Sequence, residues 1–334
     1  MMLKKVAVIK LAVVLLNVAL SGLCFGQADS LKNKLKNSKV SIQHRFLAFD
    51  EANHKLVHID ERAPSKDWSL KLEGLPWDIQ LVGNNKIHAT IKTGYYEIDL
   101  TTGKLLKTVT IPGLEGCWSI RRLPDGSALA IGDTGGERYL IQLSKENTIL
   151  RQGTIKGKGM RAGRITAEGN ALATNKENVY EWDINGNMIN HFKIPKGKGN
   201  YMALKDTDGN YWLAAGYRKS LLKLNSKGNV IQKYISPKGG KYFSGFQRLA
   251  NGHIVQTNWR GHSPKKASGG PQLIEYNLDR EIVWRYSNTS KLACPVSVII
   301  LDDLDTSKVA DDRDSILKNR VKGITLPKVS QTKP

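Results

Sequence analysis

The loop at residues 258–270 carries the side chains with the clearest chemistry. Its sequence, NWRGHSPKKASGG, holds an indole, a guanidinium and an imidazole close together, at Trp259, Arg260 and His262. An indole can stack on the face of a sugar ring, and an arginine can hold a carboxylate through two parallel hydrogen bonds. The loop therefore predicts a site for an acidic sugar. The alternative is a solvated loop with Trp259 packed against the fold.

The same region could also catalyse a reaction. A polysaccharide lyase needs a base beside the sugar acid and a cation that neutralises the carboxylate. His262 or Tyr217 could be the base, and Arg260 or Arg218 could supply the positive charge. An enzyme of this class is the alternative to a binding protein, and the identity of the catalytic residues stays open.

A repeat along the chain predicts the scaffold that positions these residues. Six short β-type runs end on a polar side chain about forty residues apart, at Asp60, Asp99, Gln142, Asp183, Asn225 and Asn277. Such a period, with several short strands in each unit, is typical of β-propeller blades. An open β-sandwich or barrel is the alternative, but it would not need a constant period.

Two-residue turns support the repeat and indicate how the ring closes. They occur at 84–85, 125–126, 168–169, 208–209 and 251–252, between alternating apolar runs. The first unit has only three strands, and one strand is left over at residues 295–301. We therefore expect an all-β, six-bladed propeller of four-stranded blades over residues 45–302, closed by the last strand joining the first blade.

One face of this propeller should be basic. Loops that enter the inner strands, and loops that join the second and third strands, open on the same face and carry Lys198, Arg218 and Lys241. Binding residues concentrate in loops on a rigid scaffold. We therefore expect an anionic ligand on this loop-rich face.

A second group of candidates lies in one register before the hairpin turns. Counting back nine residues from the residue after each turn reaches Trp77, Trp118, Arg161, Tyr201 and Ser244. These side chains could form the floor of a pocket at the channel mouth, or the aromatic ones could pack between blades. The complete set of candidate ligand-binding residues is Trp77, Trp118, Arg161, Lys198, Tyr201, Arg218, Lys241, Trp259, Arg260 and His262.

Composition and termini restrict the partners. The chain has 51 Lys and Arg against 30 Asp and Glu, a formal net charge of +21. Residues 1–26 read as a secretory signal peptide, and Cys24 follows a leucine where a lipoprotein signal needs a small residue. We expect a periplasmic or secreted protein, rather than a lipid-anchored one. An anionic polysaccharide or other polyanion fits this location as partner better than nucleic acid does, and membrane contact would be peripheral.

The remaining expectations concern organisation, metals and cysteines. Residues 27–44 form a linker, and the polar residues 303–334 form a loosely attached tail. We expect a monomer without cofactor or metal, because no His and Cys spacing suggests zinc and Asp78 is nearly alone as a calcium ligand at the channel mouth. Cys117 and Cys294 should be unpaired, although a disulfide across a narrow channel is possible.

Three segments carry a family resemblance. The stretches EIDLTTGKLL, RLANGHIVQTN and QLIEYNLDREIVWRYSN, at 97–106, 248–258 and 272–288, resemble blade repeats of bacterial quinoprotein-like and arylsulfotransferase-like β-propellers. The resemblance implies a shared scaffold, and an enzyme of either kind is a further alternative. Six predicted blades and missing acids depart from the PQQ-like dehydrogenases, which have eight blades and a calcium. No histidine of this sequence aligns with the catalytic histidine of the sulfotransferases.

Overall fold

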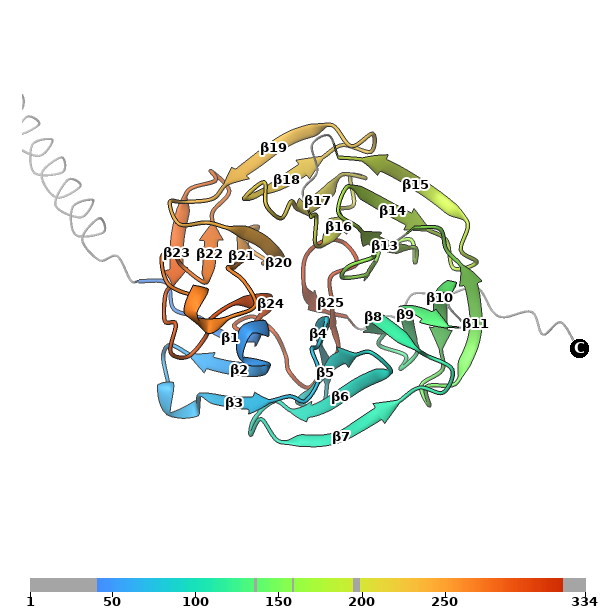
Figure 1. The fold of residues 1–334 in the computed structure, drawn as a ribbon, viewed down its shortest axis with the longest axis horizontal. Helices are drawn as coiled ribbons and strands as arrows, with labels where there is room; N and C mark the ends of the chain where they lie inside the picture. The colour runs from blue at the N-terminus through green and yellow to red at the C-terminus, as the bar shows by residue number, and fades with distance from the viewer. Residues whose placement is uncertain (1–40, 135–136, 158, 195–198, 321–334) are drawn as a thin grey trace, which may run out of the picture. The chain divides into compact units, whose positions relative to one another are not determined.

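The computed structural model describes residues 41–134, 137–157, 159–194 and 199–320. Six four-stranded antiparallel sheets form the blades of a β-propeller around a central channel (Figure 1). The predicted fold class and the number of blades are confirmed. Within the described residues no helix has the length and apolar character that a membrane span requires.

Blades 1 to 6 follow the order of the chain. Blade 1 contains, from the channel outward, β24 (Pro295–Ile300), β1 (Arg45–Asp50), β2 (Lys55–Asp60) and β3 (Trp68–Lys71). Blade 2 contains, in the same direction, β4 (Asp78–Gly83), β5 (Lys86–Ile91), β6 (Gly94–Asp99) and β7 (Leu105–Thr110). Blade 3 contains β8 (Gly116–Arg122), β9 (Ala128–Thr134), β10 (Glu137–Leu143) and β11 (Ile149–Thr154).

The other three blades repeat this pattern. Blade 4 contains β12 (Arg164–Ile165), β13 (Ala171–Thr174), β14 (Asn178–Trp182) and β15 (Met188–Lys193). Blade 5 contains β16 (Ala203–Lys205), β17 (Tyr211–Ala214), β18 (Ser220–Leu224) and β19 (Val230–Ile235). Blade 6 contains β20 (Tyr242–Arg248), β21 (Ile254–Trp259), β22 (Leu273–Tyr276) and β23 (Ile282–Tyr286).

Five of the six repeated polar residues stabilise the turn that follows the third strand of a blade. In blade 3 the turn is held by Ser144, whose hydroxyl accepts from the Glu146 amide at 3.1 Å, and not by Gln142. Asp99 accepts a hydrogen bond from the Thr102 amide at 2.7 Å, and Asp183 accepts one from the Asn185 amide at 2.8 Å. Short polar side chains that bond the backbone two or three residues later are a standard turn device. The forty-residue repeat in the sequence is therefore a repeat of turn chemistry.

The ring closes as predicted. β24 pairs antiparallel with β1, from Phe46 opposite Ile300 to Asp50 opposite Pro295, and all six residues of β24 are buried. Just outside the sheet, His44 Nδ1 lies 2.5 Å from Asp302 Oδ2, and His44 Nε2 lies 2.9 Å from Glu275 Oε2 in blade 6. These ion pairs, beyond the ends of the paired strands, reinforce the ring closure.

The expectation of a loosely attached tail is wrong for residues 303–320. This segment crosses the channel on the face of the hairpin turns and contains β25 (Ala310–Asp311) paired with β26 (Lys318–Asn319) (Figure 1). Val309 forms a bridge with Val82, and the Asn84 amide donates to the Ser307 carbonyl at 2.9 Å. The segment lacks an apolar pattern because buried ion pairs hold much of it in place, among them that of Asp312 with Arg164.

Candidate functional site

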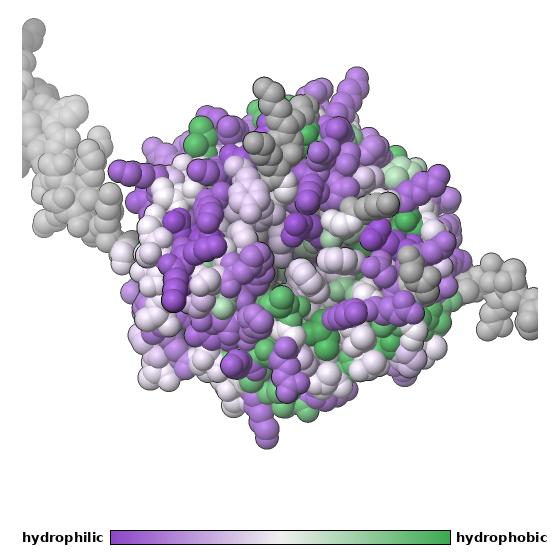
Figure 2. Space-filling model, in the orientation of Figure 1, coloured by the Kyte–Doolittle hydropathy of each residue, from purple (hydrophilic) through white to green (hydrophobic). Residues whose placement is uncertain are grey.

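A pocket of about 420 Å³ opens on the loop-rich face at the mouth of the channel. Figure 2 shows this face hollowed at its centre, with hydrophilic side chains above and to the left of the hollow and hydrophobic ones at its lower edge. Most of the lining residues come from the two sets of loops that the sequence analysis selected, and Tyr242, Trp259 and Val296 come from the ends of strands. They are Glu51, Leu75, Pro76, Trp77, Arg161, Lys176, Gly199, Tyr201, Tyr217, Tyr242, Trp259, His262 and Val296.

Aromatic rings form one continuous wall of the pocket. The ring of Tyr242 lies edge-on to three neighbours, with centroid distances of 4.7 Å to Tyr217, 5.4 Å to Trp259 and 6.3 Å to Tyr201. The Tyr242 hydroxyl donates to the Gly199 carbonyl at 2.5 Å, which fixes the central ring. Such a wall offers flat apolar surface for a ring-shaped ligand.

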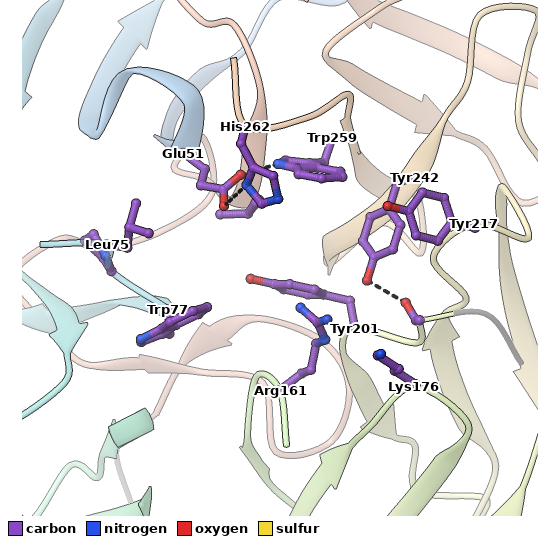
Figure 3. Close-up of a pocket in the computed structure, with 13 residues that line it drawn as sticks. Glu51, Leu75, Trp77, Arg161, Lys176, Tyr201, Tyr217, Tyr242, Trp259 and His262 are labelled. Atoms are coloured by element: carbon purple, nitrogen blue, oxygen red, sulfur yellow. Dashed lines mark hydrogen bonds and ion pairs between the residues drawn. The ribbon is translucent and has the colours of Figure 1, made fainter. Parts of the chain in front are cut away.

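The floor of the pocket combines aromatic and cationic side chains. The Arg161 guanidinium carbon lies 5.7 Å from the centroid of the Tyr201 ring, and Trp77 lies near both (Figure 3). Burial raises the pKa of Tyr201 although Arg161 opposes the shift, so the phenol stays protonated and can donate a hydrogen bond. Trp118 packs below Trp77 at a centroid distance of 5.2 Å and does not line the pocket.

A carboxylate and an imidazole form a pair at the rim. Glu51 belongs to a short 3₁₀ turn, Glu51–Asn53, directly after β1, and its Oε1 lies 2.8 Å from His262 Nδ1. Trp259 donates its indole N–H to the other oxygen of Glu51. The His262 side chain is 79% exposed, whereas that of Glu51 is 15% exposed. A fixed carboxylate that holds Nδ1–H would leave Nε2 as a proton acceptor toward the pocket.

Arg260 occupies a different position from the predicted carboxylate clamp. Its guanidinium donates to the backbone carbonyl of Gly239, and its Nε donates to the Lys266 carbonyl at 3.1 Å. Lys241 donates to the Arg260 carbonyl at 2.8 Å. Arg260 and Lys241 therefore hold the 258–270 loop in shape, and neither lines the pocket.

The other sequence candidates divide between the pocket and its surroundings. Tyr217 lines the pocket, whereas Arg218 next to it does not. Ser244 is fully buried and pairs with Thr257 at 2.6 Å, because an irregularity in β20 between Phe243 and Phe246 shifts the register. Lys198 lies outside the described residues.

Sequence reasoning missed three lining residues that contribute to the site. Glu51 and Leu75 sit in loops without a repeated motif, and Tyr242 takes the place expected for Ser244. The only sequence signal for Tyr242 was its aromatic side chain, two positions before the predicted register residue Ser244. No sequence signal pointed to Glu51, because its role depends on His262 and Trp259 in blade 6.

The cationic side chains of the pocket lie apart from its carboxylate. Arg161 and Lys176 lie on the side opposite Glu51 and His262 (Figure 3). Among the residues that the structure describes, no group of three or more His, Cys, Asp or Glu side chains is placed to hold a metal ion.

Cys117 and Cys294 are both buried and unpaired, so the alternative of a disulfide across the channel is wrong.

Fold and pocket together define a six-bladed β-propeller with an aromatic pocket at the channel mouth. No protein-family model matches the sequence, and no curated protein matches it. A protein of unknown function from Bacteroides caccae is similar in structure, with a TM-score of 0.64 and 20% identity over 77% of this chain and 98% of that chain.

Two further similar structures carry names. One is a streptogramin B lyase, with a TM-score of 0.52 and 13% identity over 76% of this chain and 91% of that one. The other is a catalytically inactive virginiamycin B lyase from Staphylococcus aureus with quinupristin, with a TM-score of 0.50 and 13% identity over 74% of this chain and 85% of that one. At these identities the likeness shows the β-propeller scaffold, which agrees with the resemblance predicted from the sequence.

Proposed function

We propose that this protein is an exported β-propeller that binds an acidic carbohydrate in the aromatic pocket. The observation that carries the proposal is the combination of an aromatic wall with Arg161 and Lys176 on one side of the same pocket. Sugars stack on aromatic faces, and a guanidinium recognises a carboxylate with directed hydrogen bonds. A volume of about 420 Å³ lies within the range of roughly 300–1,000 Å³ that is usual for small-molecule sites.

The binding mode differs from the sequence prediction in the identity of the cation. Arg161 takes the role first given to Arg260, because the Arg260 guanidinium bonds the backbone carbonyls of Lys266 in its own loop and of Gly239 in the loop before β20. Trp259 keeps its predicted role as a stacking surface, with its indole N–H fixed by Glu51. The export part of the proposal rests on the sequence of residues 1–26, which lie outside the described residues.

An array of acidic and neutral glycans tests the proposal. The expected result is binding to glycans that contain uronic or other sugar acids, with weak or no binding to neutral glycans of the same length. The matched control is Lys104→Gln, which removes an exposed cation from the opposite face without touching the pocket. Absence of binding to every acidic glycan at low salt would overturn the proposal.

A polysaccharide lyase is the second candidate, and the Glu51–His262 pair favours it. His262 Nε2 would take the proton from the carbon next to the sugar carboxylate, which Arg161 would neutralise. The released electron pair forms a carbon–carbon double bond as the glycosidic oxygen leaves with its bonding electrons, and Tyr201 would return a proton to that oxygen. Two similar structures are named lyases, although their likeness extends only to the fold.

Ultraviolet absorbance distinguishes the two candidates. A lyase produces an unsaturated sugar acid that absorbs in the ultraviolet, whereas a binding protein leaves the spectrum of the glycan unchanged. The glycan used should be one that the array identifies as a ligand, so that binding is established before activity is measured. Binding without any increase in absorbance contradicts the lyase candidate and leaves the binding proposal intact.

A further inference from the structure

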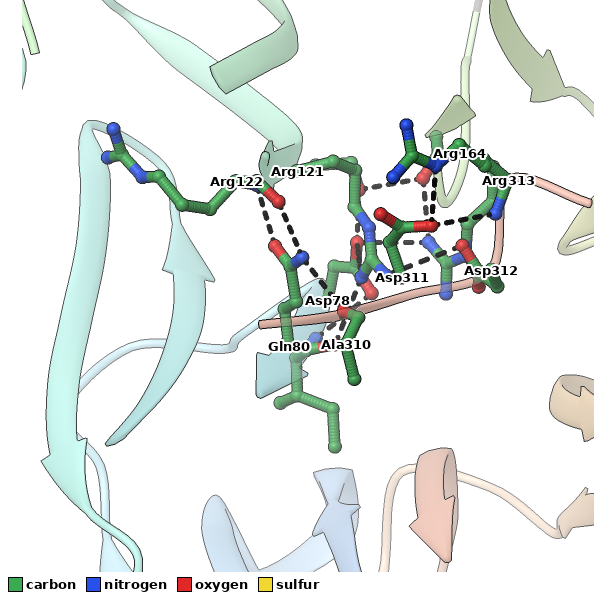
Figure 4. A network of polar contacts seen from close by, with 12 residues as sticks. Asp78, Gln80, Arg121, Arg122, Arg164, Ala310, Asp311, Asp312 and Arg313 are labelled. Carbon is green, nitrogen blue, oxygen red and sulfur yellow. Dashed lines mark hydrogen bonds and ion pairs between the residues drawn. The ribbon is translucent and has the colours of Figure 1, made fainter. Parts of the chain in front are cut away.

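A buried cluster of four charged side chains lies in the channel. Asp78 of β4, Arg121 of β8 and Arg164 of β12 project from the inner strands of three neighbouring blades, and Asp312 comes from the segment 303–320 (Figure 4). All four are buried, with at most 8% of each residue exposed.

Both arginines connect the two carboxylates. Arg164 Nε lies 2.8 Å from Asp312 Oδ2, and one of its terminal nitrogens lies 3.0 Å from Asp78 Oδ2. Arg121 reaches Asp78 at 3.3 Å and Asp312 at 3.5 Å. Asp312 is thus held by cations from two different blades, 191 and 148 positions away in the sequence.

The charge balance of the cluster depends on the C-terminal segment. The blades alone contribute two guanidinium groups and one carboxylate, and this leaves one positive charge without compensation. Burial lowers the pKa of Arg164, but the attraction of Asp78 and Asp312 outweighs it, so the net shift is upward and the side chain stays charged. An uncompensated buried charge is strongly destabilising, which makes an anion at this place necessary.

We propose that Arg121 and Arg164 form an internal anion site of the propeller, and that the chain's own Asp312 is the carboxylate that occupies it. The segment 303–320 is then an intramolecular ligand that closes the channel beneath the pocket. The chemical class that fits the site is a small carboxylate, because the aspartate side chain beyond its Cα is the equivalent of acetate.

Contacts on both sides of Asp312 hold the segment in place. The Ala310 carbonyl accepts a hydrogen bond from the Gln80 side chain at 3.1 Å. Further along, the Leu317 amide donates to the Arg248 carbonyl at 3.1 Å, and the Arg248 side chain bonds Ser315. These contacts place the main chain independently of Asp312. Removing only that carboxylate should therefore leave a vacant site of the right size.

Replacement of the side chain by a free carboxylate tests the proposal. In the full-length chain, Asp312→Gly should lower the melting temperature by roughly 5–15 °C, as expected for breaking a buried ion pair. Sodium formate or acetate should restore a large part of the loss, whereas sodium chloride at the same ionic strength should not. Asp125→Gly, which alters an exposed hairpin turn, should show no difference between these salts.

A chemical probe and a second variant complete the experiment. Phenylglyoxal followed by mass spectrometry should modify Arg121 and Arg164 faster in Asp312→Gly than in the parent, and formate should protect them. Asp312→Asn fills the same space without charge, so it should be destabilised but not rescued. If the glycine variant does not fold in buffer, the refolding yield with formate against chloride replaces the melting temperature. Equal effects of formate and chloride in both readouts would overturn the proposal.

Discussion

His262 Nδ1 lies 2.8 Å from Glu51 Oε1, although 211 positions of sequence separate the two residues. His262 belongs to the long loop of blade 6, and Glu51 follows the second strand of blade 1. The two meet because β24 closes the ring and places blade 1 beside blade 6. The pocket is therefore a product of ring closure, and its acid–base pair does not exist in either blade alone.

Glu51→Gln should separate ligand binding from catalysis. Glutamine can still accept from the Trp259 indole, but its amide nitrogen then donates to His262 Nδ1, so Nε2 carries the proton and cannot act as a base. We expect the affinity for an acidic glycan to change by less than about threefold. Any elimination activity should fall by at least about tenfold, a part of the roughly 100- to 10,000-fold that general base catalysis contributes. Calorimetry and ultraviolet absorbance provide the two readouts, and an equal loss in both would contradict the assignment.

Arg260→Ala should loosen the long loop. The guanidinium holds the carbonyls of Gly239 and Lys266, and both acceptors lose a charged donor in the variant. Limited proteolysis should then cleave within residues 258–270 faster than in the parent. Arg151→Ala, at a half-buried arginine on the outer strand of blade 3, is the matched control. Unchanged cleavage of the loop in Arg260→Ala would show that its shape depends on other contacts.

Protonated His44 should stabilise the fold, and this stabilisation should be lost at alkaline pH. Burial lowers its pKa, but hydrogen bonds to Asp302 and Glu275 outweigh burial and raise it from 6.5 to about 9. The folded pKa exceeds the unfolded one, so the contribution is complete below about pH 6.5 and is lost as pH rises through about 9. It amounts to roughly 3 kcal/mol. Melting temperatures between pH 6 and pH 10 should fall less steeply for His44→Gln than for the parent, and parallel curves would contradict this account.

Deletion of residues 303–334 should destabilise the propeller. The truncation removes Asp312 from Arg121 and Arg164, and loss of one partner of a buried ion pair costs about 3–5 kcal/mol. Deletion of residues 321–334 alone leaves both of these ion pairs in place and is the control. Chemical denaturation of both variants measures the difference. Equal free energies of unfolding would show that the segment contributes little to stability.

The scaffold could be predicted because its signals are local. Turn residues such as Asp99 and Asp183 bond the backbone within a few positions, so the turns of the blades can be recognised from short stretches of sequence. The strand left over at 295–301 could then only complete the first blade, which lacked its inner strand. The face that carries the pocket followed from strand order. The register before the hairpin turns selected the lining residues Trp77, Arg161 and Tyr201, and the long loop selected Trp259 and His262.

The rest depends on contacts between distant segments. Glu51 and Asp312 are ordinary acids in polar surroundings until the fold supplies partners more than a hundred positions away. Sequence polarity predicted a loose tail at Asp312, but charge pairing buries it. Arg260 was assigned to a ligand because a guanidinium in a loop has no local acceptor in the sequence. The fold places it beside two backbone carbonyls, that of Lys266 in its own loop and that of Gly239 in the loop before β20.

Calorimetry with a uronic acid oligosaccharide and its uncharged methyl ester tests the central claim most directly, because the two ligands differ only in charge. The parent protein should bind the acid about tenfold or more tightly than the ester, as a charged hydrogen bond to Arg161 would provide. Arg161→Gln should abolish this preference and leave the affinity for the ester nearly unchanged. Equal binding of acid and ester by the parent, or a preference that survives in Arg161→Gln, would contradict the account.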